Sequence, residues 1–144
     1  MGRGLMGVVR VYKEVVSPHL GGRCRFVQGD LFGPVQECDR PFDVVCANPP
    51  YVEDEAWDRL SPVIRLHEDP HALLAGPDGL DVVRRIAKEA RGWLRPGGML
   101  ALEIGMGQYG AVEALLAHLG YDRVESRADL AGIRRIVVAT RGQR

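Results

Sequence analysis

The spacing of apolar residues changes along the chain and predicts alternating strands and helices. Apolar runs of strand length occupy residues 42–48 (FDVVCAN) and 99–105 (MLALEIG), as expected for strands buried on both faces of a sheet. Residues 79–94 and 108–120 instead carry apolar residues at helical spacing. This alternation is typical of an α/β fold with a mostly parallel sheet and helices on its faces.

Weaker patterns complete the order of elements. CRFVQGD, residues 24–30, alternates like a short strand, and residues 6–16 fit either a helix or a strand. Residues 121–130 alternate weakly, and residues 134–141 (RRIVVATR) resemble a final strand. No helix separates these last two segments, so we expect an antiparallel hairpin that turns at residues 129–133.

The two predicted helices have one apolar face each. We expect the inward residues to be Leu80, Val83, Ile86, Ala87, Ala90 and Leu94 in the first helix and Val112, Leu115, Leu116 and Leu119 in the second. Arg95-Pro96-Gly97-Gly98 ends the first helix and turns the chain, and Gly120 ends the second. Residues 52–78 show little periodicity, which predicts a long loop with a short helix near Trp57.

The composition suits one domain of 144 residues, 46% of them hydrophobic. Nineteen basic residues balance nineteen acidic ones, so the net charge indicates neither a nucleic-acid nor a membrane partner. Basic residues 1–25 and acidic residues 30–58 are interpreted as solvated faces.

The three cysteines have no CxxC spacing, which indicates no disulfide framework and no metal site, and Cys46 is expected in the core. No apolar stretch is long enough to span a membrane and no signal peptide is evident, so we expect a cytoplasmic protein.

The residues that follow the first apolar run carry the candidate chemistry. Asn48-Pro49-Pro50-Tyr51 comes directly after a predicted buried strand, and ligands of open α/β sheets bind at the carboxyl ends of the strands. The two prolines end the ladder and stiffen the backbone, because neither offers an N–H. The Asn48 amide and the backbone carbonyls of Asn48 and Pro49 could then accept the two hydrogens of a planar –NH2 group, while the Tyr51 ring covers one of its faces. A proline-capped strand end without function is the simpler alternative.

NPPY after an apolar strand resembles the amino-methyltransferases that use S-adenosylmethionine. Three downstream segments, residues 60–86, 94–108 and 127–139, are similar to the peptide-chain release-factor glutamine N5-methyltransferases, the HemK/PrmC-type family. The distinctive part is an acidic-Pro-x-Ala-Leu pattern followed by Gly-x-Asp-Gly-Leu-Asp. The resemblance runs from about residue 23 to the end. It implies a Rossmann-like S-adenosylmethionine-dependent methyltransferase fold and a release factor, methylated on the glutamine of its GGQ motif, as the protein substrate.

The resemblance also assigns roles by position. Asn48, Pro49, Pro50 and Tyr51 would bind the glutamine side chain, with Asn48, Pro49 and Tyr51 as the catalytic residues. Asp30 and Leu31 match positions beside the adenine of S-adenosylmethionine, and Asn48 would also face this cofactor. Leu31 replaces an aromatic residue present in some family members. Glu103 corresponds to an acid of the family, with either a catalytic role or a role in fold or solubility. Glu68 and Asp69 lie on the long loop and either shape the substrate entrance or are simply solvated.

The resemblance further implies parts that this sequence does not show in their expected places. These are a glycine-rich turn after the family's first strand, an acid after its second strand and a helical domain before the catalytic domain. GRGLMG at residues 2–7 spells G-x-G-x-x-G, but no strand precedes it, so we expect a coincidental match. We therefore expect residues 1–144 to be a single, partial methyltransferase domain with an open apolar edge on its strand at 42–47. Such a chain should bind the methyl donor poorly without the missing part.

Two other functions compete with glutamine methylation. A nucleic-acid amino-methyltransferase acting on adenine or guanine would use the same NPPY chemistry, but it requires a basic, aromatic-rich surface. The acidic residues 52–58 and the zero net charge disfavour it. The second alternative is a non-catalytic fragment that only binds a partner through the open edge of its sheet.

Overall fold

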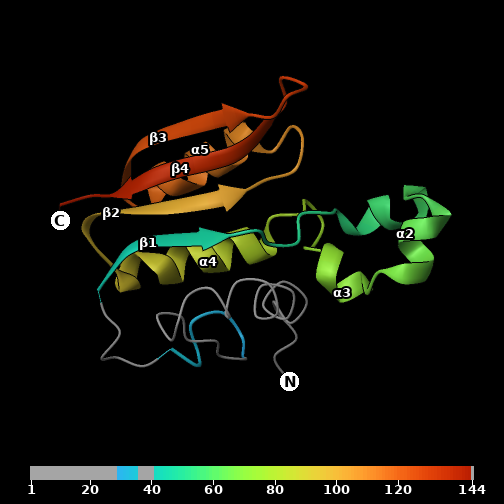
Figure 1. Cartoon of the computed structure of the whole chain (residues 1–144), viewed down its shortest axis with the longest axis horizontal. Coiled ribbons are helices and arrows are strands. Elements are labelled where there is room, and N and C mark those ends of the chain that lie inside the picture. Colours follow the sequence, from blue (N-terminus) through green and yellow to red (C-terminus); the bar gives the residue numbers. More distant parts are fainter. Residues whose placement is uncertain (1–28, 36–40, 144) are drawn as a thin grey trace, which may run out of the picture.

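The computed structural model describes residues 29–35 and 41–143. Their elements form one four-stranded sheet with two long helices on one face and a group of short helices at one end (Figure 1). The strands are β1 (Phe42–Ala47), β2 (Leu94–Glu103), β3 (Tyr121–Ala128) and β4 (Arg134–Arg141). The helices are η2 (Asp54–Arg59, a 3-10 helix), α2 (Pro62–His67), α3 (Pro70–Leu73), α4 (Asp81–Trp93) and α5 (Tyr109–His118).

The described strands lie in the order β1-β2-β4-β3. β1 pairs with β2 in parallel, whereas β2–β4 and β3–β4 are antiparallel. The expected C-terminal hairpin is therefore confirmed, and β4 inserts between β2 and its own hairpin partner. The described sheet is mixed, with one parallel and two antiparallel pairings. The predicted strand at 24–30 lies outside the described residues except for its last two positions, and the segment 6–16 lies wholly outside them.

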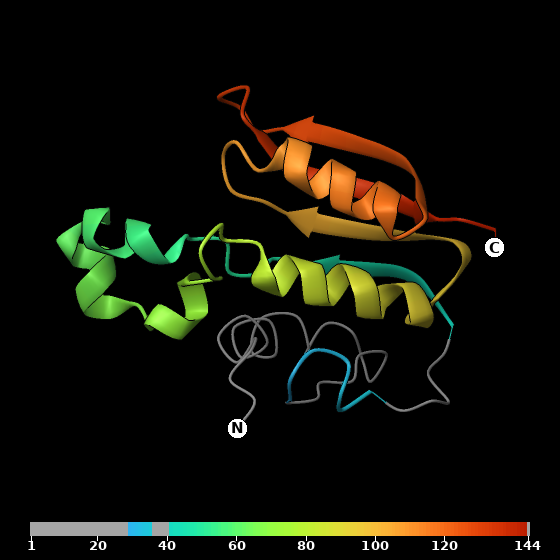
Figure 2. The ribbon, with the colours of Figure 1, turned by 180° about the vertical axis from the view of Figure 1, so that it is seen from behind.

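The two long helices cover the same face of the sheet (Figure 2). Every residue predicted to face inward from the first helix is buried in the core, and Val112 and Leu116 of α5 join them. They pack against alternate residues of the central strands, namely Leu100 and Leu102 of β2 and Val137 and Ala139 of β4. Burying such side chains contributes roughly 1.5–3 kcal/mol each, so this layer is the main stabilising contact of the domain.

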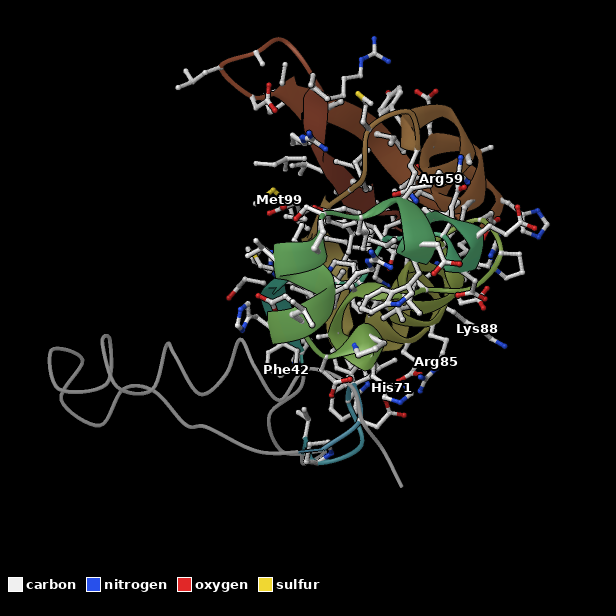
Figure 3. All side chains as sticks on the ribbon, turned by 90° about the vertical axis from the view of Figure 1, so that its right-hand side faces the viewer. Phe42, Arg59, His71, Arg85, Lys88 and Met99 are labelled. Carbon is white, nitrogen blue, oxygen red and sulfur yellow. The ribbon has the colours of Figure 1, made fainter. Side chains whose placement is uncertain are left out.

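The opposite face of the sheet corrects one expectation. β1 was expected to be buried on both faces, but Val44 is 45% exposed and Cys46 is an exposed free cysteine, not a core residue. Met99 of β2 and Ile136 of β4 are each 43% exposed on this face. Figure 3 shows Met99 on one side of the sheet and Arg85 and Lys88 of α4 on the other. Within residues 29–35 and 41–143 the long helices cover only one face of the sheet. The apolar run of β1 did not indicate this.

Two other boundaries differ from the expectations. β2 begins at Leu94 instead of Met99, because the residues expected to form a turn continue as an irregular part of the strand. Residues 52–78 contain η2 at the expected place, but also α2 and α3. Each of these two helices has a proline at its first turn and a capping side chain before it: Ser61 accepts from the Ile64 N–H, and Asp69 from the His71 N–H. No described helix is long and apolar enough to cross a membrane.

Tyr121 links β3 to α4 inside the core and makes the fold sensitive to alkaline pH. Its side chain is 3% exposed, and its hydroxyl donates to the Ala87 carbonyl at 2.8 Å. Burial disfavours the phenolate and raises the pKa of Tyr121 to about 12 from the ordinary 10.0.

Because the unfolded chain loses this proton first, the stabilising contribution of Tyr121 is complete below pH 10 and declines as pH rises toward 12. We expect the free energy of unfolding to fall by about 1.4 kcal/mol from this residue by pH 11. Denaturant unfolding of the wild type and Tyr121→Phe at pH 8 and pH 11 measures the effect. The difference between the two proteins should shrink by that amount, and a constant difference would contradict the assignment.

Candidate functional site

The candidate site lies where the two parallel strands end. Ala47 of β1 pairs with Leu102 of β2, so both strands finish at the same edge of the sheet. Asn48-Pro49-Pro50-Tyr51 leaves the sheet at this carboxyl edge, as the sequence predicted. The ladder ends here because the two prolines have no N–H to donate. The location is that of ligand sites in open α/β sheets.

The four residues of this segment differ in burial. Pro49 is fully buried, Pro50 and Tyr51 are half-buried, and Asn48 is exposed. The segment is therefore anchored by its first proline ring and presents the Asn48 amide to the outside. A carboxamide offers one carbonyl acceptor and two N–H donors, so Asn48 is available to bind a polar group. Its catalytic and substrate-binding roles stay a prediction.

The loop before α4 packs closely against Tyr51. Gly79 has φ of +70°, and a Cβ added there would lie 2.3 Å from the Tyr51 carbonyl oxygen. Gly105, which follows β2, makes a similar approach: its added Cβ would lie 3.1 Å from Cδ2 of the Tyr51 ring. Tyr51 thus fits between two backbone segments whose glycines leave little space for a side chain, least of all at Gly79. Three chain segments far apart in sequence meet at this residue.

The side chain of Gln108 joins these three segments. Its Oε1 accepts from the Gly105 N–H at 2.8 Å, and its Nε2 donates to the Tyr51 carbonyl at 3.1 Å. The same Nε2 lies 3.3 Å from the Asp78 carbonyl and 3.4 Å from the Gly79 carbonyl. No local sequence pattern marks Gln108, because its partners lie up to 57 positions away along the chain.

Asp78 fixes the loop at the start of α4. Its carboxylate accepts from the Leu80 N–H at 3.1 Å and from the Arg84 guanidinium. The hydrogen bond from Arg84 holds the pKa of Asp78 below its ordinary value, so this carboxylate is charged at neutral pH. The position of the Asp78 and Gly79 carbonyls relative to Gln108 is therefore set by the first turn of α4.

A lobe of residues 53–74 extends from the sheet immediately after Tyr51 (Figure 1). Its two ends are joined by backbone hydrogen bonds: the Val52 N–H donates to the Leu73 carbonyl and the Ala75 N–H to the Val52 carbonyl, both at 2.9 Å. In Figure 3 the lobe faces the viewer, with Arg59 and His71 on its surface. The lobe is acidic, with Glu53, Asp54, Glu55, Asp58, Glu68 and Asp69 against Arg59 and Arg65. The candidate site thus has an anionic neighbour on one side.

Asp30 and Leu31 lie in a separate turn, residues 29–35. The Asp30 carboxylate forms an ion pair with Arg85 of α4, and the Leu31 side chain packs against the core. Phe32 of the same turn stacks on Trp93 with ring centroids 5.7 Å apart. The turn is therefore attached to α4, and its described partners are on that helix and in the core rather than in the NPPY segment. The cofactor-binding role of Asp30 and Leu31 stays a prediction.

Glu103 is the last residue of β2 and is half-buried. It pairs with Ile136 of β4 and points, like Met99 and Ala101, to the face of the sheet away from α4 and α5. Among residues 29–35 and 41–143, no three His, Cys, Asp or Glu side chains are grouped to hold a metal ion. The NPPY segment itself offers amide, carbonyl and aromatic groups.

Comparison with solved structures supports the fold class. A methyltransferase from Pyrococcus furiosus aligns with 83% of this chain and 47% of its own, with a TM-score of 0.51 and 19% identity. A chain from an E. cuniculi complex that methylates the eRF1 translation termination factor aligns over 90% of this chain and 69% of its own, with a TM-score of 0.54 and 23% identity. The described fold is that of part of an α/β methyltransferase.

Sequence relatives define the family within that class. The release factor glutamine methyltransferase of Bacillus anthracis is 41% identical over 132 residues, which are 91% of this chain and 46% of the relative. The protein of the same name from Gloeobacter violaceus is 44% identical over 120 residues, 83% of this chain and 41% of the relative. No family model matches the chain. The chain belongs to the release factor glutamine methyltransferase family and spans about half the length of the curated relatives it matches.

Proposed function

We propose that this chain forms the amide-binding part of a cytoplasmic protein-(glutamine-N5) methyltransferase that acts on release factors. The observation that carries the proposal is the exposed Asn48 amide on a rigid segment at the carboxyl edge of the sheet, next to the half-buried Tyr51 ring. Relatives at 36–44% identity carry the name of this activity. This chain matches about half of the length of each of them.

The chemistry follows from what the segment can offer a carboxamide substrate. The Asn48 side-chain oxygen and the Pro49 backbone carbonyl accept the two hydrogens of the glutamine –NH2 group. The Tyr51 ring covers one face of the planar amide. The nitrogen is then held in one orientation with its N–H bonds polarised, and the amide proton leaves after the methyl group has transferred. Orientation and polarisation provide the rate increase, so the segment needs no general base.

S-adenosylmethionine would supply an electrophilic methyl group on a sulfonium. Of the described residues, Asp30, Leu31 and Asn48 would hold it. The Asp30 carboxylate can accept from an adenine amino group, although in this structure it is bound to Arg85. That ion pair is half-exposed, and exposed pairs contribute only about 0–1 kcal/mol. The carboxylate can therefore exchange Arg85 for a ligand at small cost, which supports its proposed role toward the cofactor.

The charge next to the site favours a protein substrate over a nucleic acid. Six carboxylates of the lobe lie in the segment that follows Tyr51, against two arginines. A carboxylate-rich surface repels phosphates, whereas nucleic-acid enzymes neutralise them with Lys and Arg. A GGQ loop of a release factor carries no phosphate. This charge supports the assignment of glutamine as the methyl acceptor.

Methyl transfer can be measured directly with isotope-labelled donor. We expect a chimera, in which this chain replaces the matched 132 residues of the Bacillus anthracis relative, to label a release factor on its GGQ glutamine. The reason is that the chimera combines the segment proposed here with the rest of a family member. The chain alone, incubated with the same reagents, serves as the second sample.

Mass spectrometry of the labelled peptide identifies the methylated residue. A release factor with the GGQ glutamine changed to alanine is the control and should stay unlabelled. A folded chimera that binds the donor but labels DNA or RNA in place of the release factor would overturn the proposed substrate. A folded chimera that labels none of them would overturn the proposed activity.

A further inference from the structure

We propose that Gln108 is the positioning residue of the NPPY segment: its carboxamide fixes the Tyr51 carbonyl and thereby sets the direction of the Asn48 amide. Gln108 precedes α5, whose first residue is Tyr109, and does not belong to the predicted substrate-binding set. The structural part of this inference stands on the geometry alone. Its consequence for catalysis rests on the proposed function.

The hydrogen bonds of Gln108 use both ends of its amide. Oε1 takes the N–H of Gly105, and Nε2 faces the carbonyls of Tyr51, Asp78 and Gly79 at 3.1, 3.3 and 3.4 Å. A backbone N–H on one side and three carbonyl oxygens on the other allow only one orientation of the amide. The two Nε2 hydrogens serve three acceptors, so at least one hydrogen is shared. A carboxylate has no donor and an ammonium has no acceptor, so neither could satisfy both sides.

The two glycines next to Gln108 create the space for this arrangement. An added Cβ at Gly79 would lie 2.7 Å from Nε2, and one at Gly105 would lie 2.9 Å from Oε1. Real Cβ atoms essentially never come so close, so the amide holds this position because both neighbours lack a side chain. The Gln108 carboxamide is therefore enclosed by backbone on two sides and has little freedom to rotate.

Holding the Tyr51 carbonyl restricts the whole segment. Pro49 and Pro50 have fixed φ angles, which stiffen the backbone between Asn48 and Tyr51. At the other end of the segment, the pairing of β1 with β2 fixes Ala47 opposite Leu102. With both ends fixed and a stiff middle, the direction of Asn48 depends on where Tyr51 is held. Gln108 would act on the substrate through this backbone, because its hydrogen bonds are to backbone groups of Gly105, Tyr51 and the loop before α4.

Hydrogen–deuterium exchange tests the inference without any activity measurement. In Gln108→Glu the carboxylate keeps the shape of the side chain but loses both donors and faces three carbonyl oxygens. We expect amide exchange in residues 51–54 and 75–80 to accelerate about tenfold or more, because the loops lose their common bond, while exchange inside α4 stays within twofold. Gln143→Glu, the same change at an exposed site near the C-terminus, is the matched control and should alter neither region.

A second variant covers the case in which Gln108→Glu does not fold. Gln108→Met keeps the volume without charge and also removes the hydrogen bonds, so it should give the same local acceleration. Unchanged exchange at residues 51–54 and 75–80 in the variants that fold would overturn the inference. An equal acceleration inside α4 would also overturn it, since that result indicates a general loss of stability. Failure of both variants to fold would equally exclude a purely local positioning role.

The catalytic consequence is measured separately in the chimera. We expect kcat to fall about tenfold or more in Gln108→Met, with KM for S-adenosylmethionine within twofold, because misplacement of the acceptor amide affects the methyl-transfer step. Local loosening without a change in kcat would refute the catalytic consequence alone. If the unmodified chimera is inactive, the proposed function fails. The exchange experiment still decides whether Gln108 positions the NPPY segment.

Discussion

Replacing Asn48 with alanine in the chimera should lower its rate of methyl transfer to the release factor by about 100-fold or more. Removing one preorganised polar group that acts in the transition state typically costs 10²–10³ in rate. Because the Asn48 side chain is exposed, the same change should alter the free energy of unfolding by no more than about 0.5 kcal/mol. Initial rates with labelled donor and denaturant unfolding of the same preparations measure the two quantities.

The pairing of a large kinetic effect with a small stability effect distinguishes a binding residue from a strand cap. Gln143→Ala is the matched control, since it truncates another exposed carboxamide outside the site, and its rate should equal that of the unmodified protein. A rate within threefold of the unmodified protein in Asn48→Ala would remove Asn48 from the catalytic residues. NPPY would then be a proline-capped strand end, the simpler alternative that the sequence left open.

The sequence predicted the elements whose pattern is local and continuous. The apolar face of residues 79–94 predicted four of the five buried residues of α4, because positions three to four apart share one face of a helix. Trp93, which is also buried, was not among them. β4 was placed at residues 134–141, and its hairpin with β3 followed from the absence of a helix between them. These features can be predicted because each depends only on residues close together along the chain.

The sequence predicted less well where the answer depends on a distant neighbour. The apolar run of β1 indicated burial on two faces, yet only one face is covered by α4 and α5, so Val44 and Cys46 are exposed. An apolar strand sequence shows which side chains can be buried. It does not show whether helices cover one face of the sheet or both. The helices α2 and α3 had local signals that were missed, since Ser61-Pro62 and Asp69-Pro70 are typical helix starts.

The same division applies to the candidate site. The place of Asn48 at a strand end could be predicted from one apolar run and two prolines. The contacts of Gln108 and Gly79 with Tyr51 could not, because they join segments separated by 57 and 28 positions. Residues that bind a substrate often stand out by their type, whereas residues that hold them in place are ordinary in type and special only in position. Substitutions of the residues that hold the site in place therefore give the stricter test of this structure.

Gly79→Ala is the substitution of this kind with the largest expected effect on stability. We expect it to lower the free energy of unfolding by about 2–4 kcal/mol, for two reasons. At a φ of +70° a side chain costs roughly 1–2 kcal/mol by itself. Its Cβ would also lie 2.3 Å from the Tyr51 carbonyl oxygen, so the backbone of one loop has to move. Denaturant or thermal unfolding of the chain measures the change.

Gly92→Ala is the matched control, because Gly92 lies within α4 and an added Cβ there meets nothing within 4 Å. Alanine is the better helix former, so this variant should be more stable by about 0.5–1 kcal/mol. The two glycine-to-alanine changes thus have opposite expected signs. If Gly79→Ala were as stable as the wild type, the loop before α4 could not lie against Tyr51 as described, and the enclosure of the Gln108 amide would be lost with it. Opposite signs would instead show that the loop before α4 lies against the Tyr51 backbone too closely for a side chain, which is the contact that fixes the end of the NPPY segment.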